Sequence, residues 1–417
     1  MGQEGFSDGE INTPGFALSP SGEPYVGIQD AGGAFKASVL KFDDANWTYV
    51  GNQGFSDTTA ILVSIKFNSL GEPVVLILDG TLSLTVMKFN GTQWEHIGNP
   101  QFTRAGSISF AISPTDVPYV AFEDQGGISV MKYDSNQWVY IGPRTFVSYA
   151  THPSLAISAS GVPYIAFIDY LYLNGCTVME FISGNWVPVG PRPLTAAAEY
   201  VQIRFSPSGI LFIASDGNHL QQANVRKLLG DYYWVTVGVP IISEGRAFRV
   251  RIAFSPSGDP YISYSDWTNE CLRKATVKKF DSIWTDVGTR GFPPDEAEGI
   301  GIEVNQAGVP YVAFIDYADS AKASVMMFDY PVGLPAHAAF DLKTYPDPVE
   351  NMINIEFNAQ TNSGRSIYIY NILGEKIFET VFSGKLKMID AENLPQGIYF
   401  VKVVEEDIFR VSRFYKK

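Results

Sequence analysis

The stretch FAISPTDVPYVAFEDQGGISVMKYDSNQWVYIG, residues 110–142, decides the fold because similar stretches recur along most of the chain. Each copy carries a Pro ahead of an apolar run and a Trp further on. The Pro stands at Pro24, Pro73, Pro118, Pro163, Pro260 and Pro310, with Leu211 in its place in the fifth copy. The Trp stands at Trp47, Trp94, Trp138, Trp186, Trp234 and Trp284. Successive Pro positions lie from 45 residues apart (Pro73 to Pro118) to 50 apart (Pro260 to Pro310), a spacing typical of repeat architectures.

Each copy holds four short apolar runs of alternating character, which is the number of strands in a propeller blade. One such sheet cannot bury both its faces, so the copies must stack around a common axis. The sequence therefore predicts an all-β, seven-bladed β-propeller with four-stranded blades. An open solenoid is the alternative, but it would need capping repeats that are not visible.

The ends of the repeat region predict how the ring closes. Residues 2–16 align without a gap on residues 51–65, so the chain starts in the middle of a repeat. The seventh copy breaks off at 328–333 without its Trp. We expect the seventh blade to be completed near the joined ends or left short.

Composition supports a β-protein and excludes two classes of function. Gly (38) and Pro (25) are abundant among 417 residues, while only 18% of residues are charged. The net charge of −14 and the lack of a Lys/Arg cluster argue against a nucleic-acid partner. No apolar run is long enough to span a membrane.

The first run of each copy predicts the lining of the central channel. Large residues occupy one parity and small or polar residues the other. If this run is the innermost strand, period-two alternation turns the small set toward the channel. That set is Gly15, Ser64, Ser109, Ser154, Gln202, Arg251 and Gly301.

An Asp ends the second strand of every copy. These residues are Asp30, Asp79, Asp124, Asp169, Asp216, Asp266 and Asp316. We interpret them as hairpin caps, because a feature present in all copies serves folding. A calcium-binding ring of carboxylates is the alternative, and we predict no metal site and no established cofactor.

Departures from the repeat are the candidates for function. Aromatic residues follow the strand-ending Asp in three copies: Tyr170, Tyr172, Trp267 and Tyr317. Flat rings beside carboxylates suit sugar binding. The alternative is that each ring covers a neighbouring loop.

A second departure is a basic and aromatic set in the fourth to sixth copies. It comprises His152, Tyr200, Gln202, Arg204, Arg249 and Arg251. We expect it near the mouth of the channel, where guanidinium groups would recognise a uronate, sulfate or sialate. The alternative is an internal salt-bridge network with Glu199, Glu244 and Glu303.

Catalysis has weaker support. His152 and Tyr200 would suit a polysaccharide lyase and Asp/Glu pairs a glycoside hydrolase, but no catalytic motif accompanies them. We assign no catalytic residue and favour a non-enzymatic function.

The C-terminal region resembles a known family. It contains Tyr345-Pro346-Asp347-Pro348-Val349, Ile353-Asn354-Ile355, Ile367 to Lys376 (IYIYNILGEK), Leu394 to Val403 (LPQGIYFVKV) and Lys416-Lys417. This ordered set resembles the type A C-terminal sorting domain of the type IX (Por) secretion system, with Asp347 where that family usually has Asn. The resemblance implies a small Ig-like β-sandwich, export from a Gram-negative bacterium and contact with the secretion machinery.

The predicted organisation is a propeller at 1–335, a linker at 336–343 and the sorting domain at 344–417. We predict a secreted or cell-surface protein that uses one propeller face to bind a glycan or an extracellular protein. The alternative is a carbohydrate-active enzyme, a polysaccharide lyase or glycoside hydrolase, acting on an anionic polysaccharide.

Overall fold

The structure is a computed structural model that describes residues 1–217, 220–328, 342–357, 364–371, 376–405 and 408–417. The chain divides into two compact units, Met1–Phe328 and Asp329–Lys417. The predicted propeller end at 335 and most of the predicted linker lie outside the described residues. Strand β29 (Leu342–Tyr345) begins two residues before the expected start of the second domain.

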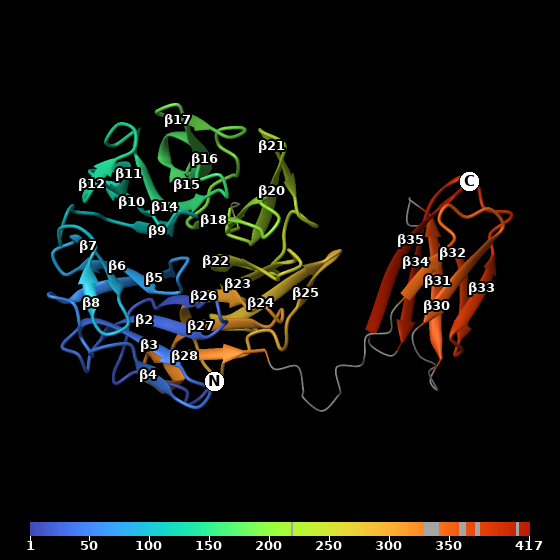
Figure 1. Cartoon of the computed structure of the whole chain (residues 1–417), viewed down its shortest axis with the longest axis horizontal. Helices are drawn as coiled ribbons and strands as arrows, with labels where there is room; N and C mark the ends of the chain where they lie inside the picture. The colour runs from blue at the N-terminus through green and yellow to red at the C-terminus, as the bar shows by residue number, and fades with distance from the viewer. Residues whose placement is uncertain (218–219, 329–341, 358–363, 372–375, 406–407) are drawn as a thin grey trace. The chain divides into compact units, whose positions relative to one another are not determined.

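The described part of the first unit contains seven antiparallel sheets, here called blades 1 to 7, which stand around a common centre (Figure 1). Blade 1 contains β1 (Gly15–Leu18), β2 (Pro24–Asp30), β3 (Lys36–Phe42) and β4 (Trp47–Tyr49). Blade 2 contains β5 (Ala60–Phe67), β6 (Pro73–Asp79), β7 (Leu84–Phe89) and β8 (Trp94–His96). Blade 3 contains β9 (Ile108–Ile112), β10 (Pro118–Asp124), β11 (Gly127–Asp134), β12 (Gln137–Tyr140) and the short β13 (Val147–Ser148). Blade 4 contains β14 (Ala150–Ile157), β15 (Pro163–Asp169), β16 (Gly175–Ile182) and β17 (Asn185–Pro188).

The remaining blades follow the same order. Blade 5 contains β18 (Val201–Phe205), β19 (Leu211–Ser215), β20 (Asn224–Leu229) and β21 (Tyr233–Thr236). Blade 6 contains β22 (Ala247–Phe254), β23 (Pro260–Asp266), β24 (Lys274–Asp281) and β25 (Ile283–Asp286). Blade 7 contains β26 (Ala297–Val304), β27 (Pro310–Asp316) and β28 (Lys322–Met327). Two 3₁₀ turns, η1 (Tyr170–Tyr172) and η2 (Tyr317–Asp319), follow the second strands of blades 4 and 7.

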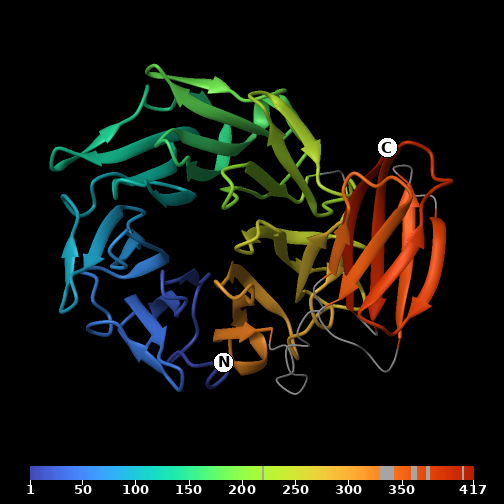
Figure 2. The same ribbon diagram turned by 45° about the vertical axis from the view of Figure 1, so that its right-hand side comes forward.

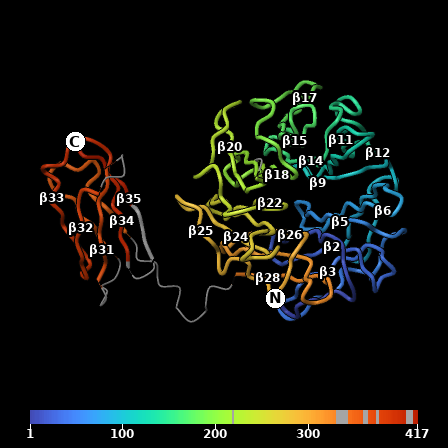
Figure 3. The backbone as a smooth tube through the Cα atoms, turned by 180° about the vertical axis from the view of Figure 1, so that it is seen from behind, coloured from blue at the N-terminus to red at the C-terminus, as the bar shows by residue number. Residues whose placement is uncertain are grey.

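The first strand of each blade contacts the first strand of the next, and β26 contacts β1, so these inner strands form a closed ring (Figure 2). The segment after β4 donates three backbone hydrogen bonds toward β3, from Val50, Phe55 and Ala60. The N-terminal segment donates the equivalent three toward β28, from Met1, Phe6 and Ile11. The N-terminus accordingly lies beside β28 (Figure 3). The chain thus starts mid-repeat, as the alignment predicts, and its first residues complete the edge of blade 7.

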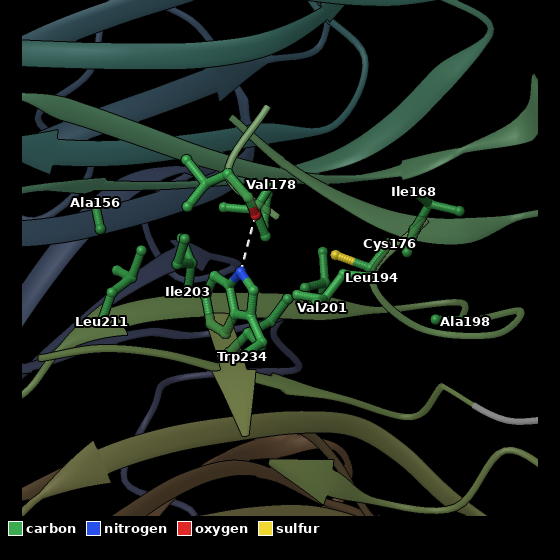
Figure 4. Packing of buried hydrophobic residues seen from close by; sticks show 13 residues of the cluster. Ala156, Ile168, Cys176, Val178, Leu194, Ala198, Val201, Ile203, Leu211 and Trp234 are labelled. Carbon is green, nitrogen blue, oxygen red and sulfur yellow. Dashed lines mark hydrogen bonds between the residues drawn. The ribbon is translucent and has the colours of Figure 1, made fainter. Parts of the chain in front are cut away.

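The repeated Trp joins neighbouring blades. The indole nitrogen of Trp234 in blade 5 donates to the carbonyl oxygen of Val189, which follows the outer strand of blade 4, at 2.8 Å (Figure 4). The same bond, to the residue that follows the preceding outer strand, is made by Trp94, Trp138, Trp186 and Trp284. Trp47 of blade 1 donates instead to the carbonyl oxygen of Met1, in the N-terminal segment beside blade 7. Around Trp234, buried side chains such as Ile203 and Val178 form one core between the two blades. The core around Trp234 therefore lies between blades, so a single blade would expose the apolar face that it buries here.

The second unit is a β-sandwich. One sheet contains β29 (Leu342–Tyr345), β30 (Met352–Phe357) and β33 (Leu386–Asp390). The other contains β32 (Lys376–Phe382), β31 (Arg365–Asn371), β34 (Gly397–Glu405) and β35 (Ile408–Lys416). Val349, Ile355, Ile369 and Val401 are buried in the core between them. Asp347 accepts a hydrogen bond from the Tyr415 backbone N–H at 2.9 Å, a role that an Asn oxygen would fill equally. The predicted class, an all-β propeller followed by a small sandwich, is confirmed.

Candidate functional site

The inner strands line the channel with equivalent positions at three depths. The outermost, the mouth ring, lies where each inner strand begins, on the face that carries the loops between second and third strands. The mouth ring comprises Thr13, Leu62, Ser107, His152, Tyr200, Arg249 and Gly299. The next, the channel ring, comprises Gly15, Ser64, Ser109, Ser154, Gln202, Arg251 and Gly301. The innermost, the lower ring, comprises Ala17, Lys66, Ala111, Ala156, Arg204, Ala253 and Glu303.

Two mouth-ring residues lie in β-bulges with left-handed backbone. The register of β14 shifts between Thr151 and Ser154, and His152 within it has φ 51°. The register of β22 shifts between Phe248 and Arg251, and Arg249 has φ 56°. Blade 7 has Gly299, with φ 61°, at the equivalent point. A bulge redirects a side chain, and non-glycine residues with positive φ gather at functional sites.

The mouth-ring side chains contact one another around the channel. The rings of His152 and Tyr200 meet edge to face at 4.7 Å, and the guanidinium carbon of Arg249 lies 5.3 Å from the Tyr200 ring centroid. Arg249 also donates to the Thr13 hydroxyl at 3.1 Å. A Cβ on the intervening Gly299 would lie 3.1 Å from the Thr13 Cα, so glycine leaves the room for this contact. We call His152, Tyr200, Arg249 and the adjoining Arg251 the mouth cluster.

The two arginines of the mouth cluster have no carboxylate partner within ion-pair distance in the described part of the chain. The neighbouring acids are used elsewhere: Glu199 lies 3.5 Å from Arg246, and Glu244 pairs with Lys278 and Arg290. Burial, together with repulsion from Arg249, lowers the pKa of Arg251 to about 10. The cluster is therefore a partly desolvated cationic site in an acidic protein.

His152 is held neutral. Burial lowers the pKa of the imidazole; Glu123 and Glu199 oppose this shift, and the arginines of the cluster add to it. Its Nδ1 is buried without a hydrogen-bond partner among the described residues. This Nδ1 is therefore a buried polar atom whose hydrogen-bonding capacity no described residue satisfies.

Asp216 supports the cluster from behind. Its carboxylate accepts hydrogen bonds from the backbone N–H groups of Glu199 and Tyr200 at 2.9 and 3.0 Å, which fixes the start of β18. Burial raises the pKa of Asp216 to about 6, against the effect of these two bonds. Its second oxygen, Oδ2, has no partner among the described residues.

Two of the predicted basic and polar candidates have structural partners. Gln202 Oε1 accepts the Ile252 backbone N–H at 2.6 Å, which links blades 5 and 6. Arg204 lies in the lower ring, away from the mouth, and donates through both terminal nitrogens to Glu303. The salt-bridge alternative therefore holds for Arg204. It does not hold for Arg249 or Arg251.

The predicted aromatic candidates are spread over three blades. Tyr170, in η1, is 52% exposed, and Tyr172 lies under the Arg192 guanidinium, 4.4 Å from its centroid. Tyr317 begins η2 in blade 7 and is 43% exposed. No contact joins these three rings to the mouth cluster in the described part of the chain.

Trp267 lies nearer to the mouth cluster but is already covered. Its ring contacts Phe248 at 5.6 Å, and Phe248 in turn contacts Tyr200 at 4.9 Å. The guanidinium carbons of Arg246 and Arg273 lie over the Trp267 ring at 4.6 and 4.5 Å. These cations occupy the ring surface that a sugar would use.

The sequence reasoning missed three residues near the channel: Lys66, Phe248 and Gly299. Lys66 had a readable signal, because four of the other six lower-ring positions are Ala. Gly299 matters because it has no side chain, which leaves room for the contact between Arg249 and Thr13. Phe248 matters because its ring contacts Tyr200 of the neighbouring blade. Neither role is visible without the ring.

The strand-ending aspartates act mainly as caps. Asp79, for example, accepts backbone hydrogen bonds from Thr81 and Ser83 at 2.8 and 2.9 Å. The residues that the structure describes include no group of three or more His, Cys, Asp or Glu placed to hold a metal ion. The hydrogen bonds thus give these carboxylates a structural role within their hairpins.

Comparison with known proteins identifies the second unit. Residues 343–417 match the family of secretion system C-terminal sorting domains. No curated protein matches the chain. The described helices are 3₁₀ turns of three residues, and none has the length or hydropathy to cross a bilayer.

Solved structures resemble the first unit in fold. One is a polysaccharide lyase, an ulvan lyase bound to -[GlcA(1-4)Rha3S]-, at 10% identity and TM-score 0.50, covering 77% of this chain and 94% of the lyase. Another is the Aleuria aurantia lectin in complex with Fucα1-6GlcNAc, at 14% identity and TM-score 0.46, covering 69% and 99%. A third is a protein of unknown function from Dyadobacter fermentans, at 10% identity and TM-score 0.43, covering 78% and 95%.

The protein is a secreted β-propeller with a cationic cluster at its channel mouth. Its C-terminal unit is a Por sorting domain, so the chain is exported by the type IX secretion system to the outer cell surface or the surrounding medium of a Gram-negative bacterium.

Proposed function

We propose that this propeller is a binding module for an acidic glycan, which it holds at the mouth cluster. One observation carries the proposal: Arg249 and Arg251 lie together without a carboxylate partner among the described residues, in a chain with 44 acidic and 30 basic residues. Where acids are in excess, unpaired arginines at one place favour an external anion.

The energetic reason is desolvation. Removing a cation from water costs several kcal/mol unless a partner compensates for the lost hydration. A carboxylate or sulfate group offers a guanidinium two parallel hydrogen bonds in a fixed geometry. An acidic sugar would therefore gain more at this cluster than a neutral sugar of the same shape.

The neighbouring groups suit the uncharged part of a sugar. Tyr200 and Phe248 supply ring surface, and the His152 ring lies against Tyr200. Such an arrangement, with few polar groups among apolar ones, is usual in ligand sites.

The test is a glycan array of acidic and neutral glycans, followed by calorimetry on the glycans that bind. Arg249→Met should weaken binding of acidic glycans by roughly 10- to 100-fold, the value of a hydrogen bond to a charged group. Arg104→Met is the matched control, because Arg104 is exposed outside the mouth cluster and the net charge changes equally. Equal binding by both variants would refute the proposal. Capture of an extracellular protein and no glycan would instead favour an adhesion scaffold.

A second candidate function is a polysaccharide lyase. The observation in its favour is the neutral His152 in contact with Tyr200, beside two arginines. His152 would take the proton from C5 of a uronate whose carboxylate is held by arginine. The C–H electrons would form the C4–C5 double bond, the C4–O bond would break, and the Tyr200 hydroxyl would protonate the leaving oxygen.

Turnover separates the two functions. A lyase would convert a bound uronate polymer into an unsaturated product that absorbs in the ultraviolet. Loss of that product in His152→Ala, with binding retained, would support the enzyme. Binding without any product in the unmodified protein would support the binding module.

A further inference from the structure

A cavity of about 420 Å³ lies within the ring of inner strands. Its polar lining comes from the channel ring and the lower ring, and includes Ser109, Ser154, Gln202, Arg251 and Lys66. This volume falls within the roughly 300–1,000 Å³ of ordinary ligand sites. The cavity is therefore large enough for a sugar-sized molecule.

The channel ring uses its acceptors to join the blades. The oxygens of Ser109, Ser154 and Gln202 accept the backbone N–H groups of Leu155, Ile203 and Ile252 at 2.9, 3.0 and 2.6 Å. A hydroxyl or amide that accepts through oxygen still has its own hydrogens to donate. No acceptor is bonded to these hydrogens in the described part of the chain. The channel ring thus offers donors to the cavity.

Cationic side chains also favour an anion in the cavity. Lys66 and Arg251 line the cavity, and neither makes a hydrogen bond or ion pair with a described residue. Glu303, the one acid of the lower ring, is engaged by both terminal nitrogens of Arg204. Burial lowers the pKa of Lys66, and this effect exceeds the opposing attraction of Glu303. Among the described residues that line it, the cavity therefore has two cations without a hydrogen bond or ion pair, several free donors and no carboxylate.

We propose that this cavity binds the oxyanion group, a carboxylate or sulfate, of a small acidic ligand between Lys66 and Arg251. The donors of Ser109, Ser154 and Gln202 surround the anion. The site lies inside the channel; it shares Arg251 with the mouth cluster, whereas Lys66 belongs to the interior site alone.

The test uses the full chain in a buffer of low ionic strength, with thermal unfolding and calorimetry as readouts. The probes are sodium glucuronate, inorganic sulfate and neutral glucose. Glucuronate or sulfate should raise the unfolding temperature saturably, and glucose should not. Tighter binding of glucuronate assigns the site to a sugar acid, and tighter binding of sulfate assigns it to a free inorganic anion.

Variants locate the site. Lys66→Met and Arg251→Met should each weaken anion binding about tenfold or more, because each removes a charged donor. Lys88→Met, a surface change away from the channel where Lys88 pairs with Glu72 at 3.0 Å, should leave it unchanged. Without anion, Lys66→Met should unfold at the same or a higher temperature, since it removes an unpaired buried cation.

The proposal is overturned if no anion binds saturably, or if Lys66→Met and Lys88→Met bind it equally. Glycan binding that is lost in Arg249→Met, together with no effect of Lys66→Met on either ligand, would retain the proposed function and reject the interior site. Anion binding by a protein that binds no glycan would retain the interior site and reject the proposed function.

Discussion

Blades 3, 4 and 6 differ from blade 5 in how they use the same aspartate. In the first three, the strand-ending Asp pairs with an arginine from the loop after the outer strand. The pairs are Asp124–Arg144 at 2.7 Å, Asp169–Arg192 at 2.8 Å and Asp266–Arg290 at 2.7 Å. Blade 5 has Pro240 at the equivalent place, and its Asp216 instead holds the backbone of Glu199 and Tyr200.

The difference separates scaffold from site. A carboxylate that is paired with arginine locks two loops of its own blade together, and the arginine favours its charged form. Asp124 shows this directly, because the hydrogen bond from Arg144 holds its pKa below the usual range. Without the arginine, Asp216 is free to position the mouth cluster, and burial raises its pKa to about 6. The repeat is thus altered where a functional residue must be placed.

Breaking the Asp266–Arg290 pair, the lock of blade 6, should have the largest effect on stability. Asp266 is 1% exposed and accepts from Arg290, Thr268 and Thr276. Asp266→Ala leaves Arg290 without its buried partner, so we expect the free energy of unfolding to fall by about 3–5 kcal/mol. Urea unfolding measures this, with Asp266→Asn as an intermediate case. A loss below about 1 kcal/mol would show that the lock contributes little to stability.

Removing the negative charge of Asp216 in blade 5 should raise the free energy of unfolding, the opposite of the effect expected for Asp266→Ala. The pKa of Asp216 is raised to about 6 in the folded state, above its unfolded value of about 4. Protonation of Asp216 therefore favours the folded state; this contribution to stability is complete below pH 4 and is lost as the pH rises through 6. Asp216→Asn keeps the oxygen that caps Tyr200. It should therefore raise the free energy of unfolding at pH 7 by roughly 1–2 kcal/mol.

Unfolding curves across this pH range check the assignment. The difference between Asp216→Asn and the unmodified protein should grow from pH 4 to pH 6 and then stay constant. A difference that does not change with pH would mean that the pKa of Asp216 is the same in the folded and unfolded states. The same change in Asp124, whose pKa is low, serves as the contrasting case.

The Asp124–Arg144 pair, the most exposed of the three, should contribute less to stability than the Asp266–Arg290 pair. The Arg144 side chain is 53% exposed, so solvent screens its bond to Asp124. We expect Arg144→Ala to cost about 0.5–1.5 kcal/mol, less than Asp266→Ala. Urea midpoints of the two variants, measured side by side, test this ranking, and a reversed order would contradict the argument from burial.

Introducing a lock into blade 5 should have the smallest effect on stability. Pro240→Arg places a guanidinium at the position of Arg144 and Arg290, and we expect a change of less than about 1 kcal/mol. If the new arginine reaches Asp216, the rise in stability toward acid should shrink because the pKa falls. An unchanged pH profile would show that the loop of blade 5 cannot form the pair.

Much of the fold was predictable from the sequence because the same strand pattern recurs in each repeat. The positions of Pro and Trp, the period-two alternation and the alignment of residues 2–16 with 51–65 together predicted blades, inner strands and closure through the N-terminus. These features are local, and each is copied several times, so chance agreement is small. The sorting domain was readable from its ordered motifs, which the family match confirms.

The candidate site was only partly predictable, since it depends on which side chains of different blades meet. His152, Tyr200, Arg249 and Arg251 were named as departures from the repeat, and the structure brings them together. Arg204 shared their chemistry, but its pairing with Glu303 joins blades 5 and 7 across the channel. No spacing within one repeat carries that information.

The sequence by itself therefore determined the strand quartets, their number of copies, the inward parity of the inner strand and the export domain, because these follow from periodicity and local motifs. Only the tertiary structure decided which cations keep a partner, that Gly299 makes room for Arg249, and that Asp216 holds the mouth cluster. The physical reason is that electrostatic pairing and desolvation depend on distances between blades, which closing the ring sets and the linear order of residues does not.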